Sequence, residues 1–351
     1  MNEFIQNGQA TGGLANVMLA NNFDVGALRP WIGNDGQSYI TANVAGVPTK
    51  QLVQNANTTL RKDEWKFLDA AVVKAAQSRL VVVGAMRAAG LSYNVPNAMG
   101  KTVLETERQG DISAAISSMD GLNEGQADRP EYDLVNLPLP ITHKDFHFSA
   151  RQIQASRNGG SPLDTSTAEL AARKVSEQIE KLTLGVASTY SFGGGTIYGF
   201  ENFPNRLTKT LTDPATSGWT GADLVGEVLA MKTQSQNAYH YGPWKLLCST
   251  NWDAVLDADY STSKGDLTLR ERLAKIEGVQ MVQTVDFLSA NTMILVQQTT
   301  DVARIVNGVD LTTVQWESHG GMRINFKVMA IMVPQLRADI NNNTGIVHGS
   351  Y

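Results

Sequence analysis

The sequence predicts an α+β protein, and three observations carry that prediction. Two long stretches, near residues 60–80 and 166–186, place apolar residues at spacings of three and four, which is typical of amphipathic helices. Several other stretches alternate between apolar and polar residues, which is typical of β-strands. Hydrophobic residues make up 42% of the 351 residues, which predicts an ordered core with room for two domains.

Composition excludes several classes of function. Charged residues are only 18% of the chain, against a usual share of about 25%, which suits a protein whose faces are covered by other copies. The formal charge of −5 argues against a protein that condenses nucleic acid by neutralising phosphates. The single cysteine, Cys248, rules out an internal disulfide and fits a reducing compartment.

Nothing in the sequence predicts a membrane or an export step. No apolar run reaches the roughly 18 residues of a membrane span. Residues 1–20 lack a basic start followed by an apolar core. We therefore expect a protein made in the cytoplasm, with no membrane partner.

Residues 1–58 are predicted to form an extended arm. They are rich in Asn and Gly and hold no amphipathic stretch longer than a turn. Such a segment becomes ordered only where another surface satisfies its backbone groups and buries its scattered large side chains. That surface is either the arm's own domain or a neighbouring subunit, and the sequence leaves both open.

The first helix is predicted from Leu60, with Trp65, Leu68 and Val72 on its apolar face, which should pack on a sheet. Turn signals then crowd residues 108–130, between alternating stretches at 101–107 and 132–139. A loop this long is uncommon without a role. The pattern predicts a long two-stranded ribbon that projects from the body.

A second, longer helix follows the ribbon. Asp164 or Ser166 is expected to cap it, with Glu169 completing a capping box. Its apolar stripe runs for about 20 residues, or about 30 Å. The opposite face holds five charged residues, namely Arg173, Lys174, Glu177, Glu180 and Lys181.

The last part of the chain predicts an α/β unit followed by long terminal strands. Helices are expected at residues 222–239, 250–256 and 267–276, and strands at 244–249, 279–285, 292–297 and 303–306. A β-rich pair at residues 311–317 and 322–333 should end at Pro334.

Several short motifs resemble active sites, but the residues around each one do not complete the pattern that the chemistry requires. Gly100-Lys101-Thr102 lacks the earlier glycine of a phosphate-binding loop, since Val95 stands at that position. His143 and His147 lie on an alternating stretch, and a strand holds positions four apart at about 13 Å, too far for one metal ion. Gly193–Gly195 lacks the full dinucleotide-binding pattern. We expect no catalytic residue, cofactor or metal, and therefore no enzyme.

The order of these parts resembles the Hong Kong 97 fold of tailed-phage major capsid proteins and encapsulin shells, in particular the encapsulin-like branch. The resemblance covers residues 58–335. It is carried by several short segments along the chain, namely Leu60-Arg61-Lys62-Asp63-Glu64-Trp65, residues 137–149 leading into Arg151, the helix at 168–184, Ile197-Tyr198-Gly199-Phe200, Tyr241-Gly242-Pro243-Trp244-Lys245-Leu246, Asn307-Gly308-Val309-Asp310-Leu311 and residues 326–334.

The resemblance implies a particular division of the chain. Residues 1–58 would be the extended N-terminal arm and residues 95–142 the extended loop. A peripheral domain, with the long spine helix, would combine residues 59–94, 143–219 and 311–351. Residues 220–310 would form an α/β axial domain facing the symmetry axes.

The resemblance also implies a structural role. The chain would be the major capsid protein of a tailed DNA bacteriophage, self-assembling as pentamers and hexamers into an icosahedral head in the host bacterial cytoplasm. Its partners would be further copies of itself, a portal, and either a separate scaffolding or decoration protein or none. The shell would enclose double-stranded DNA without sequence-specific binding.

Two departures bear on the alternative, an encapsulin-type compartment around an enzyme cargo. The arm before Leu60 is longer than the N-terminal element usual in encapsulins, and the loop is also long. Both favour the phage capsid. Trp31, Ile32 and Tyr132 are the predicted subunit-interface residues, because lone large side chains in such segments need a pocket from another surface.

Overall fold

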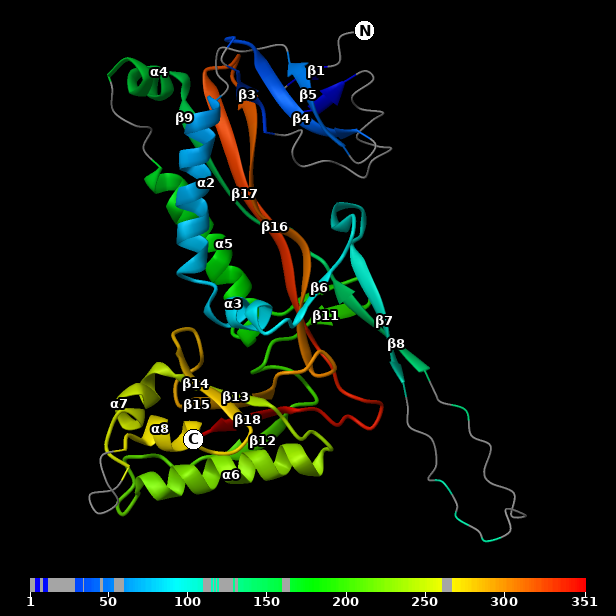
Figure 1. The fold of residues 1–351 in the computed structure, drawn as a ribbon, viewed down its shortest axis with the longest axis vertical. Helices are drawn as coiled ribbons and strands as arrows, with labels where there is room; N and C mark the ends of the chain where they lie inside the picture. Colours follow the sequence, from blue (N-terminus) through cyan, green and yellow to red (C-terminus); the bar gives the residue numbers. More distant parts are fainter. Residues whose placement is uncertain are drawn as a thin grey trace.

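Two β-sheets, one in each half of an elongated chain, organise the fold (Figure 1). This computed structural model describes residues 4–6, 9–11, 29–33, 35–44, 47–53, 60–109, 115, 117, 119, 129, 132–159, 165–260 and 267–351. Most of the predicted arm before residue 29, most of the predicted ribbon tip at 110–131, and Asp164 lie outside the described residues.

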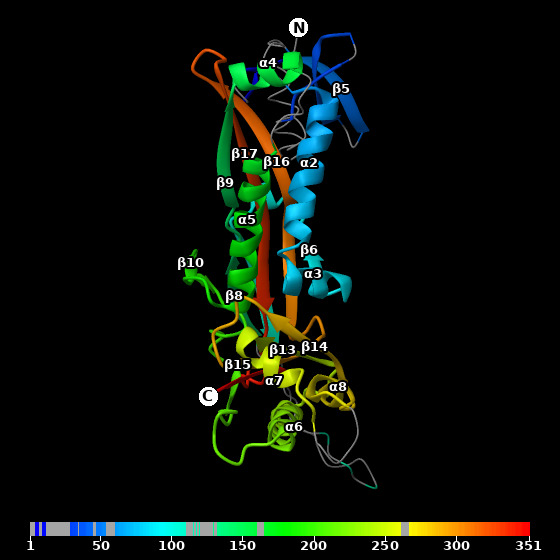
Figure 2. The ribbon, with the colours of Figure 1, turned by 90° about the vertical axis from the view of Figure 1, so that its left-hand side faces the viewer.

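The upper half contains a four-stranded sheet in the order β6-β16-β17-β9. The strands β16, β17 and β9 are antiparallel neighbours, and β6 runs parallel to β16. Helices α2 and α5 lie side by side on one face of this sheet (Figure 2). The bounds are β6 (Ser92–Asn94), β16 (Ala303–Ser318), β17 (Arg323–Leu336), β9 (Thr142–Ser149), α2 (Lys62–Gln77) and α5 (Ser166–Leu184).

The core of this half forms where the apolar faces of the helices pack against the apolar face of the sheet. Helix α2 buries Trp65, Leu68, Val72 and Ala76, which confirms the predicted stripe. Phe326 of β17 lies against the Trp65 ring, with 6.0 Å between ring centroids. Residues of one face alternate along each strand, so β9 and β17 bring further aromatic rings to the same side. The predicted packing of this helix on a sheet is therefore confirmed.

Helix α5 differs from its prediction at two points. Its N-cap is Thr165, not Ser166, and the Thr165 hydroxyl donates to Glu169 at 3.3 Å. Glu177 and Glu180, expected on the charged outer face, are only 7% and 1% exposed. A second helix, α3 (Val81–Ala88), packs over that part of α5 and removes it from solvent.

The lower half contains a five-stranded sheet in the order β12-β18-β15-β13-β14. All six residues of β13 and of β15 are buried, as expected of central strands covered on both faces. Helices α6 and α8 pack on this sheet. The bounds are β12 (Leu207–Thr210), β13 (Trp244–Ser249), β14 (Val279–Val285), β15 (Thr292–Gln297), β18 (Ile346–Ser350), α6 (Gly221–Asn237), α7 (Asp253–Leu256), α8 (Leu269–Ala274) and a 3-10 turn, η3 (Thr250–Trp252).

Each of the two sheets draws strands from more than one of the domains that the resemblance implied. Strands β12 and β18 were assigned to the peripheral part, yet both pair within the lower sheet. Residues 303–310 were assigned to the axial part, yet they begin β16 of the upper sheet. These pairings join residues far apart in the sequence, and no local pattern records them.

The strands β16 and β17 are longer than the sequence predicted. Strand β16 runs unbroken through residues 303–318, with a register shift near Gly308. Strand β17 continues past Pro334, where the sequence expected it to end. Its pairing with β9 stops at Ala330, so Pro334 lies where β17 is an edge strand. Proline is tolerated within sheets at such an edge.

The remaining elements extend from these two halves. The predicted ribbon is confirmed as β7 and β8, an antiparallel pair that projects to the right in Figure 1. The described part of residues 1–58 forms short antiparallel strands next to the upper half. The bounds are β1 (Phe4–Gln6), β2 (Gln9–Thr11), β3 (Trp31–Ile32), β4 (Ser38–Val44), β5 (Val47–Val53), β7 (Val103–Gln109), β8 (Tyr132–Pro138), β10 (Tyr190–Phe192), β11 (Gly195–Ile197), α4 (Ala150–Gly159) and a 3-10 turn, η2 (Ala98–Gly100).

Candidate subunit interface

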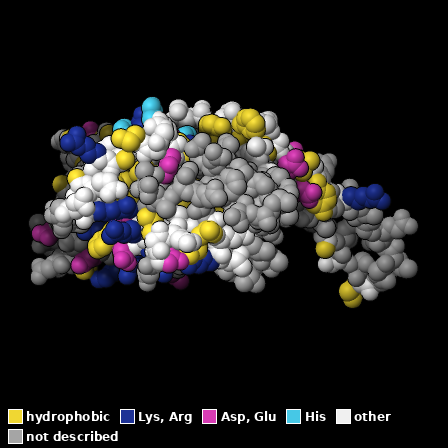
Figure 3. All heavy atoms as spheres, turned by 90° about the horizontal axis from the view of Figure 1, so that it is seen from above, with side chains coloured by type: hydrophobic (Ala, Val, Ile, Leu, Met, Phe, Trp, Pro, Cys, Tyr) yellow, Lys and Arg dark blue, Asp and Glu magenta, His cyan; other side chains and the backbone are white. Residues whose placement is uncertain are grey.

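The ribbon exposes a strip on which two large apolar side chains lie among polar ones. Strand pairing places Leu134 opposite Glu107 and Tyr132 opposite Gln109 on the same face. Tyr132 is 61% exposed and Leu134 is 64% exposed. Figure 3 shows acidic and hydrophobic side chains next to one another on this projecting part. Large exposed apolar side chains rimmed by charge mark a surface for another protein.

A short hairpin, β10–β11, fixes the direction of the ribbon. The Asn136 side-chain amide of β8 donates to the Gly193 carbonyl at 3.0 Å. Gly195 approaches the ribbon so closely that a Cβ there would lie 2.1 Å from the Asn136 carbonyl oxygen. A further hydrogen bond, from the Gln335 amide of β17 to the Thr106 hydroxyl at 3.1 Å, ties the ribbon to the upper sheet.

These contacts give the glycine turn at Gly193–Gly195 a structural role that sequence reasoning missed. The turn was weighed only as a dinucleotide loop and excluded. A run of glycines also marks a place where another backbone comes close. That signal is present in the sequence, but it does not say which backbone approaches.

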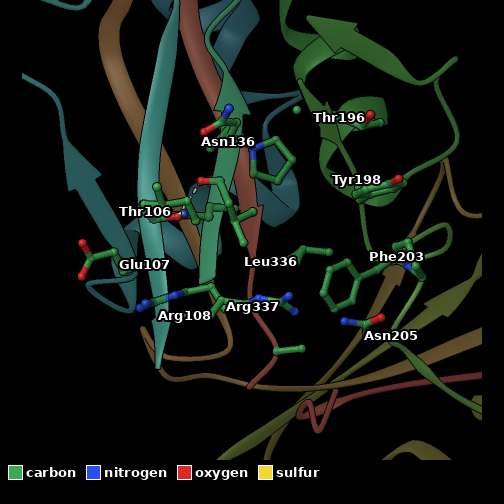
Figure 4. Close-up of a pocket in the computed structure, with 18 of the residues that line it drawn as sticks. Thr106, Glu107, Arg108, Asn136, Thr196, Tyr198, Phe203, Asn205, Leu336 and Arg337 are labelled. Carbon is green, nitrogen blue, oxygen red and sulfur yellow. Dashed lines mark hydrogen bonds between the residues drawn. The ribbon is translucent and has the colours of Figure 1, made fainter. Parts of the chain in front are cut away.

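A cavity of about 330 Å³ lies between the ribbon, the hairpin side and the end of β17 (Figure 4). Thr106 and Asn136 line it from the ribbon, and Tyr198 and Phe203 line it from the opposite wall. The cavity lies between the ribbon and the body, and Leu134 and Glu107 of the exposed strip are among the residues that line it.

A second apolar surface surrounds the base of the ribbon. Tyr190 and Phe192 of β10, with Ile141, are 44%, 51% and 44% exposed. They line a cavity of about 210 Å³ together with Lys101. Lys101 therefore lies beside an exposed apolar surface of the chain.

Of the three predicted interface residues, Tyr132 lies on the exposed ribbon strip, while Trp31 and Ile32 pair with strand β4. The ring centroids of Trp31 and Tyr39 are 5.4 Å apart. The Lys50 ammonium is 5.2 Å from the centroid of the Trp31 ring. The Ile32 amide donates to the Leu60 carbonyl at 3.1 Å, just before α2. The structure does not bring these two residues together with Tyr132, and the interface role of all three stays a prediction.

Contacts around residue 30 show how this part of the arm meets its own subunit. The Trp65 indole of α2 donates to the Pro30 carbonyl at 2.7 Å. Arg29 pairs with Asp69 of α2 at 2.6 Å and lies over the Trp65 ring. The described segment after residue 28 is therefore held by α2 of the same chain.

The histidines of the motif that resembles a metal site, and the single cysteine, lie among ordinary structural residues. His143 and His147 lie on strand β9, as predicted, and His147 contacts the Arg323 guanidinium at 3.0 Å. The Cys248 thiol is fully buried, and burial raises its pKa to about 12. Among the described residues, no three His, Cys, Asp or Glu side chains gather as metal ligands, and no helix is long and apolar enough to span a membrane.

Several known proteins are similar to this chain in sequence or in architecture. The chain is 28% identical over 200 residues to the type 1 encapsulin shell protein EncA of Myxococcus xanthus, across 56% of this chain and 63% of EncA. The chain thus spans just under two thirds of that relative. Among solved structures, the virus-like particle from Pyrococcus furiosus matches 82% of this chain and 99% of its own, with 16% identity and a TM-score of 0.56.

A phage shell protein has the same fold. The capsid of the Myoviridae phage XM1 matches 71% of this chain and 86% of its own, with 9% identity and a TM-score of 0.56. The predicted Hong Kong 97 fold is therefore confirmed. A family model described as "Family of unknown function (DUF6260)" matches residues 55–349, and the chain belongs to that family.

Proposed function

We propose that this chain is the major capsid protein of a tailed DNA bacteriophage, self-assembling into the icosahedral head. The observation that carries the proposal is the projecting ribbon, on which Tyr132 and Leu134 are 61% and 64% exposed in the single subunit. On a shell fold, such a strip fits the adjacent copy. Repeated contacts of this kind close a shell, and each contact can be modest because many form together.

The proposed role is structural and includes no catalysis, cofactor or metal. Pentamers and hexamers of this chain would form the shell, with a portal at one position and, where needed, a separate scaffolding or decoration protein. The acidic chain, with a net charge of −5, would enclose double-stranded DNA without binding its sequence. Assembly would take place in the host bacterial cytoplasm.

An encapsulin-type nanocompartment is the second candidate, and the relation to EncA favours it. The two candidates share one fold and differ in what the shell encloses. The arm favours the phage capsid, because 59 residues precede Leu60 and such a length can reach a neighbouring subunit.

Electron microscopy of the purified full-length protein tests the shell role. We expect hollow icosahedral particles, and a protein that stays monomeric at every concentration and salt condition would contradict the proposal. Particles isolated from the native source then separate the two candidates. Packaged genome DNA supports the phage capsid, whereas a single enriched enzyme inside DNA-free particles supports the nanocompartment.

Substitutions on the ribbon test its part in assembly. Leu134→Asn should reduce particle formation, because it replaces an exposed apolar side chain on the strip with a polar one. Met322→Asn, at an equally exposed position (65%) in the turn between β16 and β17, is the matched control and should assemble normally. Equal yields for Leu134→Asn and the unaltered protein would remove the ribbon from the proposal.

A further inference from the structure

The cavity between the ribbon and the body contains a guanidinium group that has no partner in the described part of the chain. Arg337 follows β17 directly and lines this cavity. Its amide donates to the Val302 carbonyl at 2.8 Å. Its carbonyl accepts from the buried Thr344 hydroxyl at 3.1 Å. Since both backbone groups are held, the backbone fixes the place from which this side chain enters the cavity.

A second arginine next to Arg337 adds to the positive charge. Arg304 of β16 pairs in register with Gln335, and its Nε donates to the Gln335 side-chain oxygen at 2.7 Å. Its guanidinium lies 4.3 Å from the centroid of the Tyr93 ring, and no described carboxylate pairs with it. Burial, and then the charge of Arg337, lower the pKa of Arg304. A bound anion would offset the repulsion between these two guanidinium groups.

The other charged residues around the cavity do not neutralise this pair. Arg108 of the ribbon forms an ion pair with Asp133. Glu107, the one carboxylate among the described lining residues, is exposed and forms no ion pair with Arg337. With Arg304 counted, positive charges therefore outnumber negative ones at this site.

The wall on the side opposite the ribbon is aromatic. Tyr198 and Phe203 line it, with ring centroids 6.4 Å apart and the rings edge to face. The Phe203 carbonyl accepts from the Arg206 amide at 3.2 Å and from the Arg206 guanidinium at 2.9 Å, which fixes this turn of the chain. Figure 4 shows Arg337 between the ribbon and the wall that holds Phe203. The cavity thus combines apolar rings with an available guanidinium.

The size and the lining of the cavity fit a small organic anion. Its volume of about 330 Å³ falls at the lower end of the range of small-molecule sites, roughly 300–1,000 Å³. Such sites combine apolar walls with a few charged groups that orient the ligand. A planar guanidinium matches the paired oxygens of a carboxylate or a phosphate. Aromatic walls favour a ring, which packs on them edge to face or in an offset stack.

We propose that this cavity binds a small aryl anion, a phosphate or a carboxylate, with its anionic group on Arg337 and its ring against Tyr198 and Phe203. The inference goes beyond the proposed shell role and does not depend on what the shell encloses. The alternative occupant, an acidic side chain of an adjacent copy, is an outcome of the last experiment below.

The first experiment titrates the unaltered full-length protein with phenyl phosphate in a calorimeter. Phenol and inorganic phosphate are the matched probes, because each lacks one half of phenyl phosphate. We expect phenyl phosphate to bind at least about tenfold more tightly than either, because it alone contacts both the guanidinium and the rings. The proposal is overturned if phenyl phosphate shows no saturable binding, or binds no more tightly than phenol or inorganic phosphate.

The second experiment removes the guanidinium. Arg337→Met keeps an apolar side chain without the charge and should weaken the binding of phenyl phosphate by on the order of 10–100-fold. Arg337→Lys should bind with intermediate affinity, because an ammonium keeps the charge but lacks the planar fork. Arg151→Met, at an exposed position in α4 far from the ribbon (Figure 1), makes the same change in net charge and should bind normally. Equal affinities for Arg337→Met and Arg151→Met would contradict the assignment.

The third experiment locates the ligand. Electron cryo-microscopy maps of the full-length protein, in the state in which it is purified, are compared with and without phenyl phosphate. We expect density next to Arg337 only when the probe is present. Density from an adjacent copy that fills the cavity without the probe overturns the proposal, and so does probe density that appears only elsewhere. This outcome can be read even if Arg337→Met fails to fold.

Discussion

Gly195 and Gly226 affect the fold in opposite ways, although both are glycines. A Cβ at Gly195 would meet the Asn136 backbone at 2.1 Å, whereas a Cβ at Gly226, inside α6, would meet nothing within 4 Å. The first glycine lets the hairpin β10–β11 touch the ribbon. The second leaves a helix turn without a side chain and raises the entropy lost on folding.

This contrast predicts opposite outcomes for one substitution. Gly195→Ala should destabilise the subunit by about 1–3 kcal/mol, because the ribbon strand must shift to admit the methyl group. Gly226→Ala should stabilise it by about 0.5–1 kcal/mol, because the helix gains an alanine at no steric cost. Denaturant unfolding measures both.

Assembly of the two variants separates ribbon placement from stability. Gly195→Ala should also lower the yield of particles, whereas Gly226→Ala should assemble as the unaltered protein does. If Gly195→Ala is as stable and assembles as well as the unaltered protein, the hairpin does not set the direction of the ribbon.

At the scale of elements, the ribbon is held at its base and exposed beyond it. Thr106 and Asn136 bind the body at the base, while Tyr132 and Leu134 lie further out with most of their surface exposed. Glu105 and Glu107 are exposed on the same face as Leu134. The ribbon therefore presents apolar side chains within an acidic setting.

The acidic setting predicts a dependence on salt. If the ribbon meets a basic surface of the next copy, raising the salt from about 0.05 M to 0.5 M should slow assembly, because exposed charges are screened. In the double variant Glu105→Gln, Glu107→Gln, light scattering should show a smaller effect of salt on the assembly rate. An unchanged salt effect in that variant would mean that other charges steer the subunits together.

At the scale of the whole molecule, one segment of the arm, at residues 29–30, contacts helix α2 of the same chain. Arg29 and Pro30 contact Asp69 and Trp65. Residues 29 and 30 therefore contact their own subunit, and both sequence-based alternatives stay open for the residues before them. Two truncations separate them.

Deleting residues 2–28 should leave the melting temperature of the subunit unchanged and lower the stability or yield of particles. Deleting residues 2–50 should in addition lower subunit stability by about 1–3 kcal/mol, because the Trp65 indole loses its acceptor. Circular dichroism should show near-native helix content in both. Particles of normal yield and melting temperature from the shorter deletion would show that residues 2–28 do not strap subunits together.

Local patterns in the sequence determined most of the elements of this protein. The stripe at Trp65, Leu68 and Val72 indicated α2, and the buried runs at β13 and β15 have the bounds that were predicted. The alternation on both sides of the turn-rich loop indicated the ribbon. Each of these signals lies within one element, where the periodicity of side chains depends on the backbone alone.

Only the tertiary structure decided which elements pair and which charges are buried. It placed β18 beside β12 and β15 in the lower sheet, and it carried β17 past Pro334 because β9 no longer pairs there. It also turned Glu180 from an apparent surface charge into the buried cap of α3. The physical reason is common to these cases: pairing and burial depend on residues distant in the sequence, and a local pattern holds no record of them.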